Sequence, residues 1–137
     1  NKKREDMLQI TALYASLLAF IYIKLSVNVI KLRKFHKVSL GHKNHKDLEQ
    51  AIRAQANFIE YVPFALILLS CLEINKIHPI IVFVLGGLLL VGRFLHAKSF
   101  TIPGIDTTKR AQGMKFTLWS IRLMAIMLIF SFLISFI

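Results

Sequence analysis

The sequence is poor in cysteine and in acidic residues. Cys71 is its only cysteine, which excludes a disulfide within the chain and leaves the redox compartment open. We interpret Cys71 as a packing residue, because a free cysteine mostly behaves as a small buried hydrophobe. Seven Asp and Glu stand against eighteen Lys and Arg, and the formal net charge is +11. With no low-complexity tract and no internal repeat, the chain is a strongly basic unit held together by noncovalent packing.

Apolar side chains are abundant. They make up 55% of the residues, and the mean hydropathy is +0.59, more than a soluble domain of 137 residues needs. Four apolar spans of membrane length follow one another. They run from Met7 to Leu32, Leu48 to Leu72, Pro79 to Ala97 and Gly113 to Ile137. We predict an all-α integral membrane protein, a four-transmembrane-helix up-down bundle, in one domain over residues 7–137. Met7 is a candidate for the native start, and residues 1–6 would then be an added remnant or an extension; which residue is the native start stays open.

The basic charge would favour nucleic-acid binding in a soluble protein, but membrane topology explains it more simply. The first and third connections between spans carry nine basic residues, and the second carries only Lys76. These nine are Lys31, Arg33, Lys34, Lys37, Lys43 and Lys46 in the first connection and Lys98, Lys109 and Arg110 in the third. In an up-down order these two connections share a side, which the positive-inside rule makes cytoplasmic. We therefore expect cytoplasmic connections one and three, and no nucleic-acid partner.

The second span carries a polar stripe. Gln50, Arg53, Asn57 and Glu60 follow at spacings of three, four and three, which places them on one face of a helix. A charged side chain deep in a bilayer costs at least ~2.5 to 3.5 kcal/mol, so the stripe must face a polar partner or ligand. Two other interpretations stay open: the stripe joins helices across an oligomer interface, or it lines a channel or transporter.

Two charges of this stripe need partners elsewhere. Arg53 and Glu60 are seven residues apart, about 10 Å along a helix, which is too far for a direct ion pair. The partners open to Glu60 are Arg93, Arg122 or the ammonium group of a ligand. Those open to Arg53 are Glu49 or a ligand carboxylate. Because arginine outnumbers acid here, a cavity at this level favours a small anionic ligand.

Several smaller predictions concern the helix ends and packing. We expect Asp47 to be the N-cap of the second helix. His42 and His45 have no third ligand nearby, so we interpret them as solvated loop residues and expect no metal site. Lys24 interrupts the first span, where it either snorkels to an interface or makes a polar contact in the bundle. The Gly86–Gly87 pair is typical of a close helix approach.

Three motifs resemble those of a known family. The run from Arg53 to Pro63, RAQANFIEYVP, closely resembles the R-A-x-x-N-x-x-E-x-x-P signature of the membrane-associated proteins in eicosanoid and glutathione metabolism, the MAPEG family. Gly92-Arg93-Phe94-Leu95-His96 looks like the family's G-R-x-x-H, and Arg110 followed by Gly113-Met114 resembles the start of the fourth helix in bacterial members. The overall pattern is similar to an uncharacterised bacterial inner-membrane branch.

The resemblance implies a homotrimer that binds glutathione as a co-substrate between neighbouring subunits, near the cytoplasmic side. The second helix would hold the backbone and charged ends of glutathione through Arg53, Asn57, Glu60, Tyr61 and, more weakly, Gln55. From the third helix, Arg93 and His96 would line the site. From the adjoining helix, Arg33, or Lys31 or Lys34 beside it, would bind a carboxylate.

The resemblance also implies chemistry. Arg110 would stabilise the thiolate of glutathione, with Arg93 or Arg122 as the alternative. The implied function is a glutathione transferase or peroxidase that acts on a hydrophobic electrophile or lipid from the bilayer. Phe100 stands where eicosanoid-making relatives often have tyrosine, so leukotriene and prostaglandin chemistry is not implied. The alternative is a non-catalytic membrane protein whose polar stripe joins helices or binds lipid, and whether the chain is an enzyme stays open.

Overall fold

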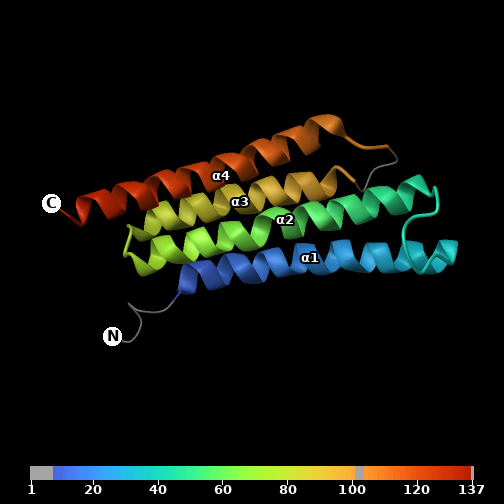
Figure 1. Cartoon of the computed structure of the whole chain (residues 1–137), viewed down its shortest axis with the longest axis horizontal. Helices are drawn as coiled ribbons and strands as arrows, with labels where there is room; N and C mark the ends of the chain where they lie inside the picture. The colour runs from blue at the N-terminus through green and yellow to red at the C-terminus, as the bar shows by residue number, and fades with distance from the viewer. Residues whose placement is uncertain (1–7, 101–103, 137) are drawn as a thin grey trace.

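The computed structural model describes residues 8–100 and 104–136, and these form a bundle of four helices. The helices are α1 Gln9–His36, α2 Lys46–Ile74, α3 Pro79–Lys98 and α4 Thr107–Ile134. They alternate in direction, so the first and third connections lie at one end of the bundle and the second at the other (Figure 1). All four are long and apolar enough to cross a membrane. The predicted all-α four-helix architecture is confirmed, while the predictions for residues 1–6 and Met7 lie outside the described residues.

α2 and α4 begin earlier than their apolar spans, because polar first turns precede the apolar residues. α4 starts at Thr107 rather than Gly113, where the carboxylate of Asp106 accepts a hydrogen bond of 3.0 Å from the backbone N–H of Lys109. This hydrogen bond lowers the pKa of Asp106. α3 begins with Pro79 in its first turn, where the missing N–H of proline would have had no helical partner.

The prediction that Asp47 caps α2 is wrong, because the helix begins at Lys46 and His45 occupies the cap position. Asp47 lies in the first turn, where a carboxylate is favoured by the helix dipole. It also contacts Nε2 of His36 at 2.8 Å, which ties the end of α1 to the start of α2. The ring of His45 stacks on His36 with centroids 3.9 Å apart. His45 and His42 are half-buried rather than solvated.

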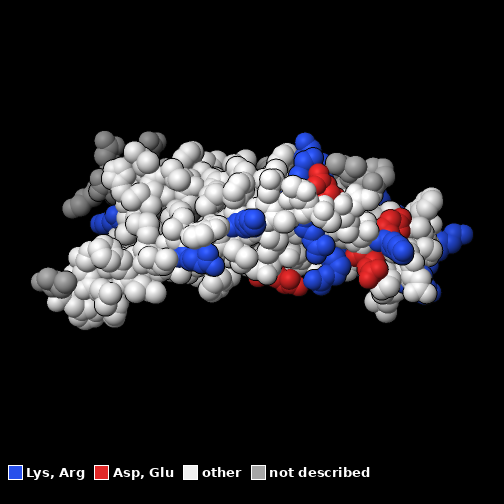
Figure 2. All heavy atoms as spheres, turned by 90° about the horizontal axis from the view of Figure 1, so that it is seen from above, with Lys and Arg blue, Asp and Glu red and all other residues white. Residues whose placement is uncertain are grey.

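The helices differ in length, and this difference defines two parts of the molecule. α3 has 20 residues, about 30 Å, which matches the hydrocarbon thickness of a bilayer. α1 and α2 have 28 and 29 residues, and their hairpin extends past the C-terminal end of α3 (Figure 1). Lys and Arg side chains gather at this end, while most of the remaining surface in view carries no charge (Figure 2). The bundle therefore has one basic end and an apolar body.

Glycine allows the closest helix contacts. At Gly113 of α4, an added Cβ would lie 2.6 Å from the backbone oxygen of Gly92 and the backbone nitrogen of His96, both in α3. At Gly86, an added Cβ would overlap the ring of Tyr14, whose hydroxyl donates to the carbonyl of Phe83 at 2.6 Å. The close approach predicted for Gly86 is confirmed, and the α3–α4 contact is a second one.

The N-terminus of α1 is satisfied by a residue of α2. Leu8 occupies the N-cap position without a side-chain hydrogen bond. The carboxylate of Glu73 accepts instead from the backbone N–H of Ile10 at 2.9 Å, and from the backbone N–H and hydroxyl of Thr11 at 2.8 Å each. This carboxylate satisfies backbone N–H groups that have no partner within the helix, and it fixes α1 against the end of α2.

Candidate functional site

A buried arginine lies where three helices meet. Arg93 of α3 is only 1% exposed, because Gly92 before it allows α4 to pack against the backbone of α3. Its Nη2 donates to Oδ1 of Asn57 in α2 at 2.8 Å and lies 3.3 Å from Nδ1 of His96. Its Nη1 contacts the sulfur of Met114 in α4 at 3.8 Å. We call Asn57, Arg93, His96 and Met114 the buried polar network.

The buried polar network contains a cation without an anion. None of the ion pairs among the described residues involves Arg93, and the option that Glu60 is its partner is wrong. Nε of Arg93 and Nε2 of His96 are buried and have no hydrogen-bond partner. Buried polar groups are normally paired, and a buried charge is costly unless it is paired. The network therefore has unused capacity to bind a polar or anionic group.

The stripe on α2 lies along the flank of this network. Asn57 is half-buried and bound to Arg93, whereas Arg53 and Glu60 are exposed. Within residues 8–100 and 104–136, neither Arg53 nor Glu60 forms a hydrogen bond or an ion pair, so the option that Arg53 pairs with Glu49 is also wrong. The reason is that the buried face of α2 is apolar and turns Arg53 and Glu60 away from the other helices of the same chain.

The depth of the stripe follows from its bond to α3. Arg93 lies five residues before the end of α3, about 7.5 Å along the helix. Asn57 is level with it, Arg53 is one turn nearer the basic end, and Glu60 is one turn deeper. The stripe therefore occupies the half of the bundle next to the first and third connections. A polar ligand would reach it from that side without crossing the apolar body.

Arg110 is joined to the network by an aromatic side chain. Its guanidinium lies 5.5 Å from the ring centroid of Phe100, and that ring is 5.3 Å from the ring of His96. Arg110 is otherwise exposed. Arg122 is twelve residues further along α4, about 18 Å, and stacks on Trp119 at 4.6 Å. Of these two arginines of α4, Arg110 is the one next to the buried polar network.

Other predicted site residues have contacts of their own. Nη1 of Arg33 donates to the carbonyl oxygens of Gly41 and Ser39 at 2.9 and 3.3 Å, which fixes the first connection. Nε2 of Gln55 donates to the hydroxyl of Ser26 in α1 at 2.9 Å. Tyr61 is half-buried. The chain thus brings together Asn57, Arg93, His96 and Arg110, but it holds Arg33 and Gln55 apart from them.

Sequence reasoning missed two members of this arrangement. Met114 contacts Arg93 directly, and Phe58 lies under its guanidinium with the ring centroid 5.7 Å away. Phe58 follows Asn57 in the signature-like run, and Met114 follows Gly113, so both stood beside residues that the motifs marked. The motifs could therefore have pointed to both residues. That they contact Arg93 follows only from the packing of α2 and α4 on α3.

Comparison with known proteins agrees with the four-helix membrane architecture. The family model described as MAPEG family matches residues 11–134. The Inner membrane protein YecN of Escherichia coli strain K12 is 36% identical over 91 residues, which cover 66% of this chain and 70% of that protein. YecN of Escherichia coli O6:H1 strain CFT073 matches with the same identity and coverage. Together with the four membrane-length helices, these matches establish that the chain is an integral membrane protein of the MAPEG family.

Proposed function

We propose that this protein binds glutathione at the polar flank of α2 and uses it, as a transferase or peroxidase, on a hydrophobic electrophile from the bilayer. The observation that carries the proposal is the exposed pair Arg53 and Glu60 beside Arg93, which is buried and has no carboxylate partner among the described residues. Arg53 and Glu60 are about 10 Å apart along the helix, and Arg93 lies at a height between them. This arrangement suits an extended ligand that carries both positive and negative groups. Glutathione-related activity is typical of the family, which supports this choice of ligand.

The charges of glutathione complement those of the site. Glutathione brings two carboxylates and one ammonium group, and a guanidinium binds a carboxylate through a bidentate pair of hydrogen bonds. Arg53 and Arg93 are the groups for the carboxylates and the peptide carbonyls. Glu60 is the group for the ammonium. Asn57 and Tyr61 supply the remaining polar contacts to the peptide.

The site requires residues from a second copy of the chain. Gln55 follows Arg53 by two positions, which turns it about 200° round α2, so one chain presents the two residues on opposite sides of the helix. In a homotrimer, Gln55 and Arg33 of one subunit approach the Arg53 face of the next. The exposed charges of the stripe are then covered by protein and ligand rather than by lipid, which removes the cost of placing them in hydrocarbon.

Arg110 is the residue that we assign to thiol activation. An unperturbed thiol has a pKa of ~8.5 and is mostly protonated at pH 7. A guanidinium beside the sulfur stabilises the thiolate, which is the nucleophile that attacks an electrophile. Arg110 is exposed next to the network, so it can contact the sulfur of glutathione. Among the described residues, the contact it would give up is the one with the ring of Phe100.

We further propose that the protein lies in a bacterial inner membrane with its basic end in the cytoplasm. The name of YecN states that location for the relative. The nine basic residues of the first and third connections favour the cytoplasmic side by the positive-inside rule. Glutathione is charged and enters from water, so a site near the basic end is accessible to it.

Isothermal titration of glutathione into the purified protein tests the binding site. We expect Glu60→Ala and Arg53→Ala each to weaken binding by ~2 kcal/mol or more, about thirtyfold, because each leaves a charged group unpaired in a poorly solvated site. Glu49→Ala removes an exposed carboxylate of the same helix and should leave the affinity unchanged. Unchanged affinity for the first two variants, with loss of the oligomer, would favour a stripe that joins subunits and binds no ligand.

A further inference from the structure

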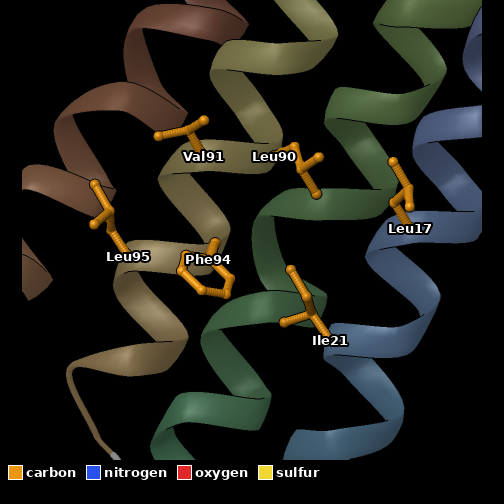
Figure 3. A pocket seen from close by; sticks show the side chains of 6 residues that line it. All are labelled: Leu17, Ile21, Leu90, Val91, Phe94 and Leu95. Atoms are coloured by element: carbon orange, nitrogen blue, oxygen red, sulfur yellow. The ribbon is translucent and has the colours of Figure 1, made fainter.

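An open apolar groove runs between α1 and α3, on the surface of the bundle. Its volume is about 350 Å³, at the lower end of the range for small-molecule sites. Leu17 and Ile21 line it from α1, across from the side chains of α3 (Figure 3). The lining residues of α3 are Leu90, Val91, Phe94 and Leu95. With no polar side chain among these six, the groove suits a hydrocarbon chain.

On α1 and α3, lysines follow the groove at one of its ends. On α1, Leu17, Ile21 and Lys24 follow at spacings of four and three, so Lys24 continues the lining face by one turn. On α3, Nζ of Lys98 lies 5.8 Å from the ring centroid of Phe94. α1 and α3 run in the same direction, so both lysines lie toward the basic end of the bundle (Figure 1). Both are exposed.

Charge at this end of the groove is uniformly positive on the two helices that form it. Neither α1 nor α3 contains Asp or Glu. Lys31 lies seven residues after Lys24, again on the lining face and nearer the basic end. Basic positions between transmembrane helices, next to an apolar surface, are the pattern that binds acidic lipid headgroups. The lysine at the end of α3 is also at the level where a bilayer's hydrocarbon ends.

We propose that the α1–α3 groove binds an anionic glycerophospholipid of the surrounding membrane, with one acyl chain along the six apolar residues and the phosphate at Lys24 and Lys98. Three observations select this occupant: an apolar groove of this volume, lysines of α1 and α3 at its basic end, and the absence of Asp and Glu from these two helices. Val91 and Leu95 are each two positions from Arg93, so this part of the groove lies on the opposite side of α3 from the guanidinium, while Leu90, three positions before Arg93, lies toward it. The phosphate at Lys24 and Lys98 uses none of the residues assigned to glutathione.

Native mass spectrometry of the purified full chain, mixed with equal amounts of phosphatidylglycerol and phosphatidylcholine, tests the proposal. We expect the wild type to retain phosphatidylglycerol preferentially. Lys24→Gln and Lys98→Gln should each lower this preference about fivefold, since one lysine contributes attraction of that size to an acidic lipid. Lys115→Gln, an exposed lysine of α4, is the matched control and should leave it unchanged.

The groove itself is tested by filling it. We expect Val91→Trp to lower retention of both lipids, whereas Ile126→Trp on the exposed face of α4 should not. Soluble glycerol phosphate should not compete, because the acyl chain contributes the binding energy in the groove. Equal retention of the two lipids by the wild type would overturn the proposal. So would a Val91→Trp variant that changes the oligomeric state with lipid retention intact, because a second copy of the chain would then cover the groove.

Discussion

At the scale of single residues, the most informative group is the guanidinium of Arg93. It is buried to 1% exposure with an amide, an imidazole and a thioether around it, and among the described residues it has no carboxylate. A protein tolerates such a group when other contacts hold it in place, here the helix crossing at Gly92. The arrangement thus leaves one buried cation without an anion in the described part of the chain.

Arg110 differs from Arg93 in being exposed, and this difference predicts different effects of mutation. We expect Arg110→Ala to keep glutathione affinity within a few fold, because the proposed site assigns the carboxylates to Arg53 and Arg93. It should lose most of the conjugation rate toward a model electrophile at pH 7 and recover part of it as the pH rises toward the ~8.5 of a free thiol, where the thiolate forms without help. Rates measured from pH 6.5 to 9 check this.

Lysine at position 110 is the matched variant. It should rescue only part of the rate at pH 7, because an ammonium group is more strongly hydrated and has a different reach. An alanine variant as fast as the parent over the whole pH range would reject Arg110 as the activating group and make Arg93 or Arg122 the better candidate. A parent that binds glutathione but never conjugates or reduces a peroxide would remove the enzymatic part of the proposed function.

Glu73 is the residue that we expect to matter most for stability at the other end of the bundle. Its carboxylate accepts three hydrogen bonds from the first turn of α1, where the helix has no cap of its own. Glu73→Ala should cost about 1 to 2 kcal/mol, since it removes a cap and a favourable charge at a helix N-terminus. Thermal unfolding in detergent measures the loss. Glu49→Ala, which removes an acid without hydrogen bonds, should lower the midpoint much less.

At the scale of helices, the crossing of α3 and α4 connects stability to the site. Gly92 and Gly113 face each other so closely that a methyl group on either would contact backbone atoms rather than a side chain that could move. The same turn of α3 carries Arg93, and Met114 next to Gly113 contacts it. A change in the spacing of these two helices therefore changes the position of the guanidinium.

Gly113→Ala tests this connection. The added Cβ would lie 2.6 Å from backbone atoms of Gly92 and His96, so the helices must separate, at a cost of about 1 to 3 kcal/mol. We expect a lower unfolding temperature together with weaker glutathione binding. Gly87→Ala is the control, because its Cβ would meet only the hydroxyl of Tyr14, at 3.3 Å. If both variants behave alike, the α3–α4 crossing does not position the site.

At the scale of the whole molecule, the basic end determines how the bundle sits in a membrane. The α1–α2 hairpin extends past α3 there, and Lys and Arg gather on it (Figures 1 and 2). An up-down bundle with charge at one end has one favourable orientation by the positive-inside rule. The end with the polar stripe should therefore face the cytoplasm.

Cysteine labelling checks the orientation. In a chain whose Cys71 has been replaced by alanine, Asn44→Cys in the first connection should react with a membrane-impermeant maleimide only after the cells are opened. Asn75→Cys, next to the second connection, should react in intact cells. Labelling of position 44 from the outside would reverse the topology and exclude a cytoplasmic glutathione site.

The sequence by itself determined the number of helices, their order and their membrane length. Each of these properties depends on local composition, because about 20 consecutive apolar residues suffice to define a span. It also marked Asn57, Arg93 and His96, since a polar residue in such a span stands out without any structure. Arg110 lies before the fourth span, and only its motif marked it. The predicted helix boundaries were wrong at some helix ends. For example, the N-cap of α2 is His45 and not Asp47.

Only the tertiary structure decided which of the marked groups meet. Arg93 binds Asn57 from 36 positions away rather than Glu60, and Glu73 caps a helix 63 positions before it. The cations around the α1–α3 groove likewise come from helices distant in the sequence. Such contacts depend on how the helices are rotated and how they cross. The crossing of α3 and α4 is set by Gly92 and Gly113, whose lack of a side chain matters only where a second helix packs against them.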